Sequence, residues 1–392
     1  MTARQIRPDE RDAAHRVQTI AFLGASDPDY DTHDPEDEKA HCWAYFNEDD
    51  TLMACLDVLP YTMMFDGHLV KMAGIGSVST LPEHRRGGHV RSIFQQIMTP
   101  LRDEGVLFSY LYPFSHDFYR RFGYELCSVH DVATIQLEHV NRFASTGHLE
   151  HFQKDDPVTP YLEVHQAFSR AFNLAVVQDE AAMRYTLESA SDNKRRYVYL
   201  WRDDAGQAKS YLVFSTEGDD SPCTMVIRRF EWLDGAGFQG MLSMLSKFSN
   251  PYEKCRWHVP PGVDYTALVS EPWKIECSRE CCGMGRVIDV PAALALMRPP
   301  ISDGGVVISV VDDFLAWNNS NYAVEWSSGA LNVTPTKQSA DATIPVTTLM
   351  QLMCGFTTPA TAQLSNSLTI DSGDAALAQL FPPKPIYITE RF

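Results

Sequence analysis

The stretch that decides the fold is Val78-Ser79-Thr80-Leu81-Pro82-Glu83-His84-Arg85-Arg86-Gly87-Gly88-His89-Val90-Arg91. An apolar strand ends at the start of this stretch, a turn that contains Pro82 follows, and the glycine pair then opens a helix. We predict that helix over residues 88–104, because apolar side chains recur there at three- and four-residue spacing. They are Val90, Ile93, Phe94, Ile97, Met98 and Leu101.

A glycine pair at a helix start is typical of an anion-binding site. Glycine lets the backbone approach a ligand closely, the first-turn N–H groups have no intrahelical partners, and the helix dipole adds positive potential. Arg85, Arg86 and Arg91 add positive charge around the pair. A Walker loop is excluded, because it requires Gly-Lys-Ser/Thr at this point. The alternative is an ordinary helix N-terminus with solvated surface arginines.

The composition bounds the class of protein. A length of 392 residues predicts about two or three domains. Hydrophobic residues make up 44% of the chain and charged residues 21%, which is typical of a folded globular protein. The formal net charge of −18 argues against a nucleic-acid or anionic-membrane partner. It suits a cationic substrate, and acidity for solubility explains it equally well.

Nine cysteines with no paired framework predict a reducing, cytoplasmic environment. We expect no signal peptide, because no apolar stretch follows the N-terminus, and no transmembrane helix, because no apolar run reaches about 18 residues. Cys277, Cys281 and Cys282 cluster, but no C-x-x-C or neighbouring His pair completes a zinc set. We therefore expect no metal.

The first third of the chain is predicted to contain strands followed by a helix and further strands. Asp66-Gly67 lies between apolar runs and predicts a hairpin. The elements expected around the hairpin and the 88–104 helix are strands at 51–59, 60–65, 68–80, 106–112 and 124–137 and a short helix at 114–122.

The middle third repeats this order, and the last part differs from both. We predict helical structure over 157–191, a helix at 238–248, and strands at 196–202, 209–215, 223–233 and 254–259. The remainder is rich in Ser, Thr and Asn. Its predicted helices are 347–354 and 373–380, and its predicted strands are 305–311, 322–326, 330–335, 342–346, 367–370 and 386–390. The fold class is therefore α/β, or α+β, with mixed central sheets flanked by helices.

A second glycine motif occurs at Gly235-Ala236-Gly237-Phe238-Gln239-Gly240 and spells G-x-G-x-x-G. A dinucleotide fold requires an acidic residue at the end of the next strand, whereas the predicted strand 254–259 carries His258 there. We therefore interpret the motif as a turn.

The strand–turn–Arg-x-x-Gly–helix unit resembles motif A of the GCN5-related N-acetyltransferases (GNAT), which holds the pyrophosphate of acetyl-CoA. Val90 stands where that family usually has a small residue. The block from Phe118 to Glu125 is similar to the x-Tyr-x-Arg-Phe-Gly-Tyr block of the Eis (enhanced intracellular survival) acetyltransferases. The stretch from Val287 to Leu294 resembles the entry to the third domain of that family.

The resemblance implies tandem GNAT folds and a C-terminal α+β sterol-carrier-protein-like domain. The corresponding divisions are a catalytic domain at 1–145, a degenerate GNAT-like domain at 146–284, and the third domain at 285–392. It also implies a homo-oligomer, since Eis-like proteins are often hexamers.

The resemblance further implies acetyl-CoA as the co-substrate, and assigns residues to it. Backbone groups of Val78, Ser79 and Thr80 would bind the pantetheine arm, and Phe114 and Ser115 would flank the far end of the cofactor. The residues implied for the pyrophosphate are Arg86, Gly87, Gly88, His89, Val90 and Arg91.

Two catalytic groups are implied in the same way. Tyr119 would be the general acid, and the free α-carboxylate of Phe392 the general base. A phenol of pKa about 10 can protonate a leaving thiolate, whereas a terminal carboxylate, of pKa about 3.3–3.7, is a weak base unless burial raises its pKa. If its pKa is not raised, the carboxylate would act mainly by holding the ammonium group, with proton removal through water. Tyr124 is the alternative acid, although we expect it to pack in the core.

The implied function is N-acetylation of a small cationic acceptor, aminoglycoside- or polyamine-like, by direct attack in a ternary complex. A lysine acetyltransferase is the alternative. The acidic segment 27–38 would attract a cation or be a solvated loop, and Arg391 beside the expected base does not favour a polyamine. Lipid binding by the C-terminal domain is a hypothesis of another class. Its tunnel residues, which would otherwise be plain core, are Leu349, Met350, Leu352, Met353 and Phe356.

Overall fold

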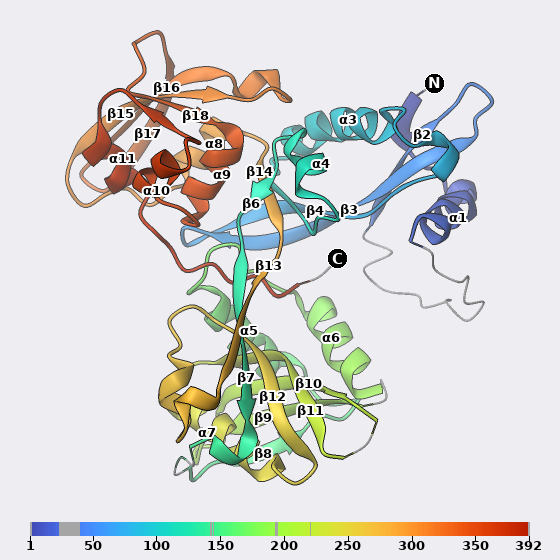
Figure 1. Ribbon diagram of the computed structural model, residues 1–392, viewed down its shortest axis with the longest axis vertical. Coiled ribbons are helices and arrows are strands. Elements are labelled where there is room, and N and C mark those ends of the chain that lie inside the picture. The colour runs from blue at the N-terminus through green and yellow to red at the C-terminus, as the bar shows by residue number, and fades with distance from the viewer. Residues whose placement is uncertain are drawn as a thin grey trace. The chain divides into compact units, whose positions relative to one another are not determined.

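The structure is a computed structural model that describes residues 2–22, 40–141, 143, 145–192, 195–219 and 221–390 (Figure 1). It contains two compact units. The first holds the chain up to Ser128 together with 282–384 and Glu390, and the second holds 129–281 and 385–389. No helix in these described ranges has the length and apolar character needed to cross a membrane.

The sheet of the first unit has seven strands in the order β1-β2-β3-β4-β5-β14-β6. The predicted Asp66-Gly67 hairpin is confirmed, since both residues have positive φ, 48° and 90°, and join β3 to β4. Strand β14 arrives from far along the chain and pairs antiparallel with β5 and β6. The strands are β1 (Thr2–Gln5), β2 (His41–Phe46), β3 (Leu52–Phe65), β4 (His68–Thr80), β5 (Phe108–Leu111), β6 (Glu125–Leu126) and β14 (Met284–Val287).

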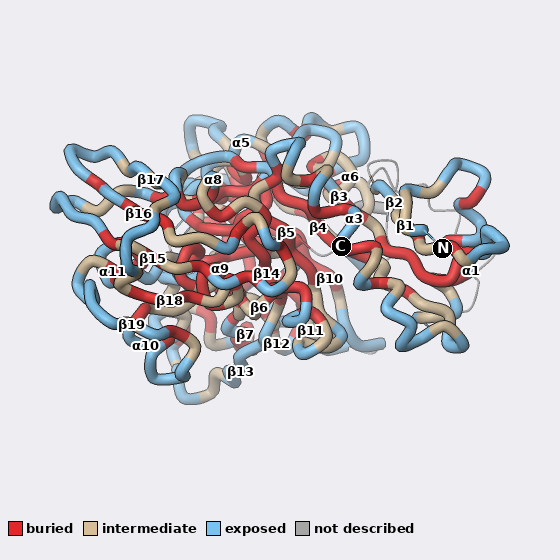
Figure 2. Tube along the Cα trace, turned by 90° about the horizontal axis from the view of Figure 1, so that it is seen from above, coloured by how far each residue is buried: buried red, intermediate tan, exposed pale blue. Residues whose placement is uncertain are grey.

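Helices cover both faces of this sheet because side chains alternate along β3. Ala54 packs in the cluster that contains α3 (His89–Asp103), whereas Cys55 packs against α1 (Arg11–Ala21). The predicted 88–104 helix is confirmed as α3, and the predicted 114–122 helix is the shorter α4 (His116–Arg120). Strands β5 and β14 are buried throughout (Figure 2).

A five-stranded sheet in the order β17-β16-β15-β18-β19 forms the rest of the first unit. Leu349, Met350, Leu352 and Met353 are at most 1% exposed, as expected of plain core, while Phe356 is half-buried. Its strands are β15 (Gly304–Val311), β16 (Ser320–Ser327), β17 (Ala330–Thr336), β18 (Ala342–Pro345) and β19 (Thr369–Ile370). The helices around it are α8 (Val290–Ala295), α9 (Val346–Cys354), α10 (Pro359–Leu364) and α11 (Asp374–Leu380).

The second unit contains a seven-stranded sheet in the order β13-β7-β12-β11-β10-β9-β8. The predicted 157–191 helical region is two helices, α5 (Thr159–Ser169) and α6 (Glu180–Asp192). The other elements are β7 (Val129–Gln136), β8 (His148–His151), β9 (Arg196–Arg202), β10 (Ala208–Glu217), β11 (Cys223–Trp232), α7 (Gly235–Leu245), β12 (Tyr252–Val259) and β13 (Glu276–Cys281).

The G-x-G-x-x-G motif forms the first turns of α7 rather than a separate turn. Asp234 caps this helix by accepting a hydrogen bond from the Gly237 N–H at 2.9 Å. A Cβ on Gly237 would lie 2.5 Å from the Lys209 carbonyl oxygen, and one on Gly240 would lie 2.2 Å from the Trp201 ring. These glycines therefore allow the helix to pack closely on the sheet.

Two strand predictions differ from the structure. The 124–137 run is divided between β6 in the first sheet and β7 in the second, so the chain changes sheets near 128/129. The predicted final strand at 386–390 is wrong, because Ile386 forms only an isolated bridge to Asn173. Among the described residues no strand continues the pairing beyond this bridge.

Core packing beneath α3 gives the first prediction. Phe94 is fully buried and stacks on Phe122 with ring centroids 4.7 Å apart. Phe94→Ala should lower the free energy of unfolding by about 3–5 kcal/mol, because it removes a buried ring and leaves a cavity. Gln95→Ala, on the exposed side of the same helix, should change it by less than about 0.5 kcal/mol. Denaturant unfolding measures both, and similar midpoints for the two variants would contradict the packing described.

Candidate active site

Strand β4 separates from β5 at the centre of the first sheet. The two strands pair in parallel only from Met72 to Ile75, whereas β4 continues to Thr80 alongside β3. The register of β3 and β4 shifts between Cys55 and Asp57, opposite a segment in which Ser77 has φ 51°. Beyond Ile75 the edge of β4 that faced β5 has no strand partner in the described chain. Its peptide groups can therefore pair with an extended ligand.

The loop after β4 presents a helix N-terminus to the same region. Arg86 and Gly88 have positive φ, 66° and 78°, and α3 begins at His89. No atom lies within 4 Å of the position that a Cβ on Gly88 would occupy. The start of α3 lines the cavity, and the first N–H groups of a helix have no intrahelical partners, which suits an anion.

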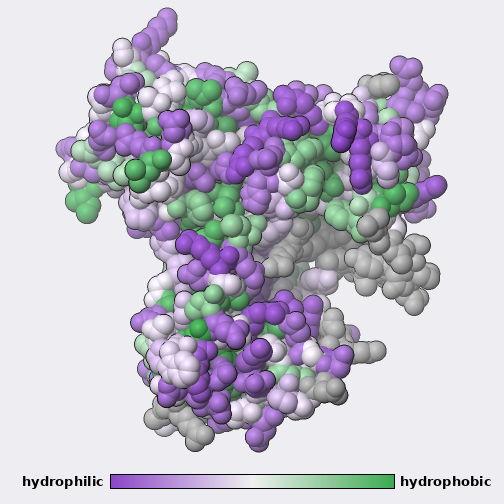
Figure 3. Space-filling view, in the orientation of Figure 1, coloured by the Kyte–Doolittle hydropathy of each residue, from purple (hydrophilic) through white to green (hydrophobic). Residues whose placement is uncertain are grey.

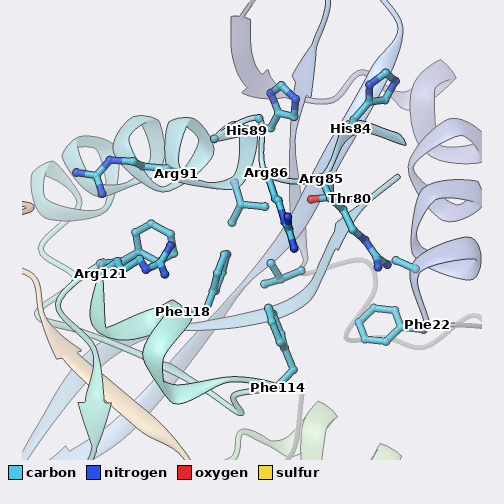
Figure 4. A pocket seen from close by; sticks show the side chains of 16 residues that line it. Phe22, Thr80, His84, Arg85, Arg86, His89, Arg91, Phe114, Phe118 and Arg121 are labelled. Atoms are coloured by element: carbon cyan, nitrogen blue, oxygen red, sulfur yellow. The ribbon is translucent and has the colours of Figure 1, made fainter. Parts of the chain in front are cut away.

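A cavity of about 760 Å³ lies against this loop and the free end of β4. The side chain of Arg86 extends from the loop toward the rings of Phe114 and Phe118 (Figure 4). The residues that line the cavity are Ala21, Phe22, Val78, Thr80, His84, Arg85, Arg86, Gly87, Gly88, His89, Val90, Arg91, Phe114, Phe118, Arg121 and Phe122.

The cavity wall is cationic on one part and aromatic on another. Arg85, Arg86, Arg91 and Arg121 supply positive charge, and none of them has a salt bridge within the described residues. Phe114 is 69% exposed, so an apolar surface faces the cavity without a protein neighbour covering it. A ligand that carries phosphates at one end and an apolar arm at the other fits this division.

His89 adds no charge to the cavity at neutral pH. Burial and the nearby His84 lower the pKa of His89 below its ordinary value of 6.5. Its ring packs on Tyr45 with centroids 4.5 Å apart. The arginines and the helix N-terminus therefore supply the positive potential.

Tyr119 lies behind the aromatic wall of the cavity. It is 2% exposed, and its ring contacts those of Phe114 and Phe118 with centroids 5.3 and 5.1 Å away. Burial, with a smaller contribution from Tyr124, raises the pKa of Tyr119 above its ordinary value of 10. The hydroxyl therefore stays protonated at neutral pH.

Tyr124 is fully buried and packs in the core, as expected. Its hydroxyl shares a 2.7 Å hydrogen bond with the Ser109 Oγ. That bond leaves Tyr124 less free than Tyr119 to donate a proton to a ligand.

The structure brings together all of the predicted cofactor residues except two. The Ser79 hydroxyl donates to the Ser77 carbonyl oxygen, and Ser115 caps α4 by accepting from the Phe118 N–H. Neither side chain lines the cavity. Phe392 and the acidic segment 27–38 lie outside the described residues.

Sequence reasoning did not assign several lining residues to the cofactor. The Arg120-Arg121 pair could have revealed Arg121, because Arg120 is engaged by Asp117 and Glu125 and its neighbour is left free for a ligand. Phe22, Phe118 and Phe122 are apolar residues that sequence alone cannot distinguish from core. Among the described residues no His/Cys/Asp/Glu group is arranged to hold a metal ion.

Family models match three parts of the chain. Residues 2–127 and 174–287 each match an acetyltransferase (GNAT) domain, and residues 290–389 match a sterol carrier protein domain. This is the domain order that the resemblance predicted. The chain is a GNAT acyltransferase with a C-terminal sterol carrier protein domain. Its tandem GNAT domains, with mixed sheets flanked by helices, and its sterol-carrier-like third domain confirm the predicted fold class.

Solved structures share the fold of this GNAT acyltransferase over its whole length. A probable N-acyltransferase from Enterococcus faecalis is 21% identical with a TM-score of 0.86, covering 100% of both chains. A GCN5-related N-acetyltransferase from Anabaena variabilis is 19% identical with a TM-score of 0.88, again covering 100% of both chains. Eis1 from Mycobacterium abscessus is 18% identical with a TM-score of 0.83 and the same coverage. No curated protein matches the sequence.

The anion site gives the second prediction. Gly88→Glu should weaken acetyl-CoA binding at least tenfold, the effect of about 1.4 kcal/mol, because it places a carboxylate where the phosphates would lie. Isothermal titration calorimetry measures the affinity.

Gly105→Glu is a matched control for this variant. Gly105 also has positive φ, 76°, with nothing within 4 Å of its Cβ position, and it follows the other end of α3. Both variants add one carboxylate, and both place a non-glycine residue in the left-handed backbone region, which costs about 1–2 kcal/mol of stability. Equal acetyl-CoA affinities in the two variants would contradict the assignment of the phosphates to the loop that contains Gly88.

Proposed function

We propose that this acyltransferase moves the acetyl group of acetyl-CoA to an amine of a small cationic acceptor by direct attack in a ternary complex. One observation carries the proposal: among the described residues, the edge of β4 beyond Ile75 has no strand partner, and it adjoins a cavity lined by a helix N-terminus and by arginines without salt bridges. The β4 edge would pair with the pantetheine arm, and the loop that contains Gly88 would hold the phosphates.

The reaction moves protons at two atoms. The acceptor ammonium loses one proton, the resulting amine forms a bond to the thioester carbonyl carbon to give a tetrahedral intermediate, and the nitrogen loses a second proton before the amide is complete. Collapse of the intermediate breaks the carbon–sulfur bond, and the departing thiolate of CoA takes a proton. We assign that proton to Tyr119, which adjoins the cavity wall through Phe114 and Phe118 and remains protonated at neutral pH.

The base is proposed to be the α-carboxylate of Phe392, acting directly or through water. Support comes from Glu390, which is 8% exposed and whose carbonyl oxygen accepts a hydrogen bond from the Tyr112 hydroxyl. Tyr112 follows the last residue of β5, where β4 and β5 separate. Two further residues span about 7 Å, which is a short reach from Glu390 to that opening.

The acceptor class is proposed from charge. The net charge of −18 suits an aminoglycoside- or polyamine-like cation. Hydrophilic side chains of either sign cover much of the face in Figure 3. A thiol-release assay with acetyl-CoA over aminoglycosides, polyamines and lysine peptides tests the class. Turnover with lysine peptides alone would favour the alternative acceptor. The homo-oligomeric state and cytoplasmic location stay predictions.

The third prediction concerns the acid. Tyr119→Phe should lower kcat by roughly 10²-fold or more while acetyl-CoA binding is retained, because only the proton donor is removed. Steady-state kinetics with calorimetry measures both quantities. Tyr124→Phe is the comparison, and a large loss there with none in Tyr119→Phe would reverse the choice of tyrosine.

The fourth prediction concerns the chain end. A C-terminal extension converts the α-carboxylate of Phe392 into a neutral amide, and deletion of Phe392 moves the carboxylate by more than about 1 Å, enough to damage catalysis. Both variants should lose acetyl transfer and still fold, since the change is terminal. The same tag at the N-terminus should leave activity intact. A fully active C-terminally tagged enzyme would exclude the carboxylate and leave Glu390 as the next candidate.

A further inference from the structure

Arg286 is a charged residue at the centre of the catalytic unit. It lies on β14, is 0% exposed, and donates from Nη2 to the Asp312 Oδ2 at 2.7 Å. Asp312 follows β15 in the sterol-carrier-like domain and is 2% exposed. A buried ion pair of this kind is weak evidence for stability, because apolar residues of similar volume often serve as well. Stability alone therefore does not account for the pair, and its other contacts show which part of the chain it holds in place.

Arg286 makes a second contact, to the backbone after α4. Its Nη1 donates to the carbonyl oxygen of Phe122, which lines the cavity. The contact requires glycine at the next position, because Gly123 has φ 81° and a Cβ there would lie 1.7 Å from the Arg286 Nη1. The guanidinium thus fixes the peptide group directly after α4.

That peptide group belongs to the turn that carries Tyr119. The Phe122 N–H donates to the Tyr119 carbonyl oxygen at 2.9 Å, and the Tyr124 N–H donates to the same oxygen at 3.4 Å. A shift of Phe122 would therefore move the backbone of Tyr119. A displacement of about 1 Å is enough to damage a catalytic geometry.

Asp312 is held rigidly by its own loop. Its Oδ1 accepts from the backbone N–H groups of Phe314 and Leu315 at 3.0 and 2.9 Å, and its Oδ2 accepts from the Asn318 Nδ2 at 2.9 Å. The carboxylate is therefore preorganised to receive Arg286.

Phe314, on the same loop as Asp312, contacts two residues that line the cavity. Its ring packs on Phe122 with centroids 5.5 Å apart, and the Arg91 guanidinium lies 5.1 Å from its centroid. One loop of the sterol-carrier-like domain thus supports both the turn after α4 and a cavity arginine.

We propose that Asp312 and Arg286 form a clamp through which the sterol-carrier-like domain positions Tyr119 for proton transfer. The inference rests on the proposed acid role of Tyr119. Arg286 and Asp312 are positioning residues, since they contact the turn and not the reacting atoms. The third domain is thereby given a role in the acetyl-transfer step.

The fifth prediction tests the clamp with a double-mutant cycle. Asp312→Asn removes the charge, while the amide oxygen can still accept the loop N–H groups. It should lower kcat about tenfold or more in the wild-type background, because the turn loses its fixed position. In the Tyr119→Phe background it should lower kcat by less than about twofold, because the group that it positions is already gone.

Asp289→Asn is the matched control. Asp289 also belongs to the third domain and accepts from the Arg102 Nε on α3 at 2.8 Å, but it does not contact the 119–124 turn. It should leave kcat within about twofold of wild type.

A second variant covers the case in which Asp312→Asn fails to fold. Arg286→Met with Asp312→Asn removes both charges of the pair, while the amide oxygen can still accept from the loop N–H groups of Phe314 and Leu315, so this double variant should fold. It should show the same loss of kcat, since Phe122 loses its donor.

The outcomes distinguish the clamp proposal from the acid role of Tyr119, on which it rests. Equal losses of kcat from Asp312→Asn in both backgrounds, or full activity of the folded double variant, would overturn the clamp alone. If Tyr119→Phe by itself leaves kcat unchanged, the acid assignment is wrong and the clamp proposal falls with it.

Discussion

The β-bulge opposite Asp57 is the constraint on which the site depends. The register shift between β3 and β4 places Ser77 at φ 51°, a conformation that costs a non-glycine residue about 1–2 kcal/mol. Local bonds hold it there: the Ser79 hydroxyl donates to the Ser77 carbonyl oxygen, and the Asp57 carboxylate accepts from the side chains of Ser77 and Gln18. Burial raises the pKa of Asp57 even though these bonds oppose the rise. The strain is retained because it directs β4 away from β5 and leaves backbone groups for a ligand.

The catalytic sheet is completed by residues that come late in the chain. Strand β14 is inserted between β5 and β6, so the edge of β5 is covered only when residues 284–287 return to the first unit. The same strand carries Arg286, which connects the turn after α4 to the third domain. The catalytic GNAT fold therefore depends on a strand from much later in the sequence. An isolated N-terminal fragment would expose the edge of a fully buried strand.

The elements predicted well from sequence are those specified by local pattern. The spacing of apolar residues gives α3, Asp66-Gly67 gives the hairpin, and the glycine pair gives the loop at the cavity. The elements predicted poorly depend on pairing between distant residues. Alternation over 124–137 cannot reveal that the chain changes sheets at Cys127 and Ser128, and alternation over 386–390 cannot reveal that no strand pairs with it. The burial of Tyr119 is also non-local, because it packs in one core cluster with Phe94 on α3 and Met284 on β14.

Burial also governs the proton transfer that we propose for Tyr119. An isolated phenol whose pKa is raised above 10 is a poor acid toward a thiolate in water. A thiolate that departs into the same low-dielectric surroundings is also poorly solvated, and its own pKa rises for the same reason. The two groups stay matched only if the phenol and the sulfur share one dry environment. The aromatic rings around Tyr119 supply that environment, and the hydrogen bonds of the 119–124 turn hold the phenol within it. Excluding water and fixing position are therefore two results of the same packing.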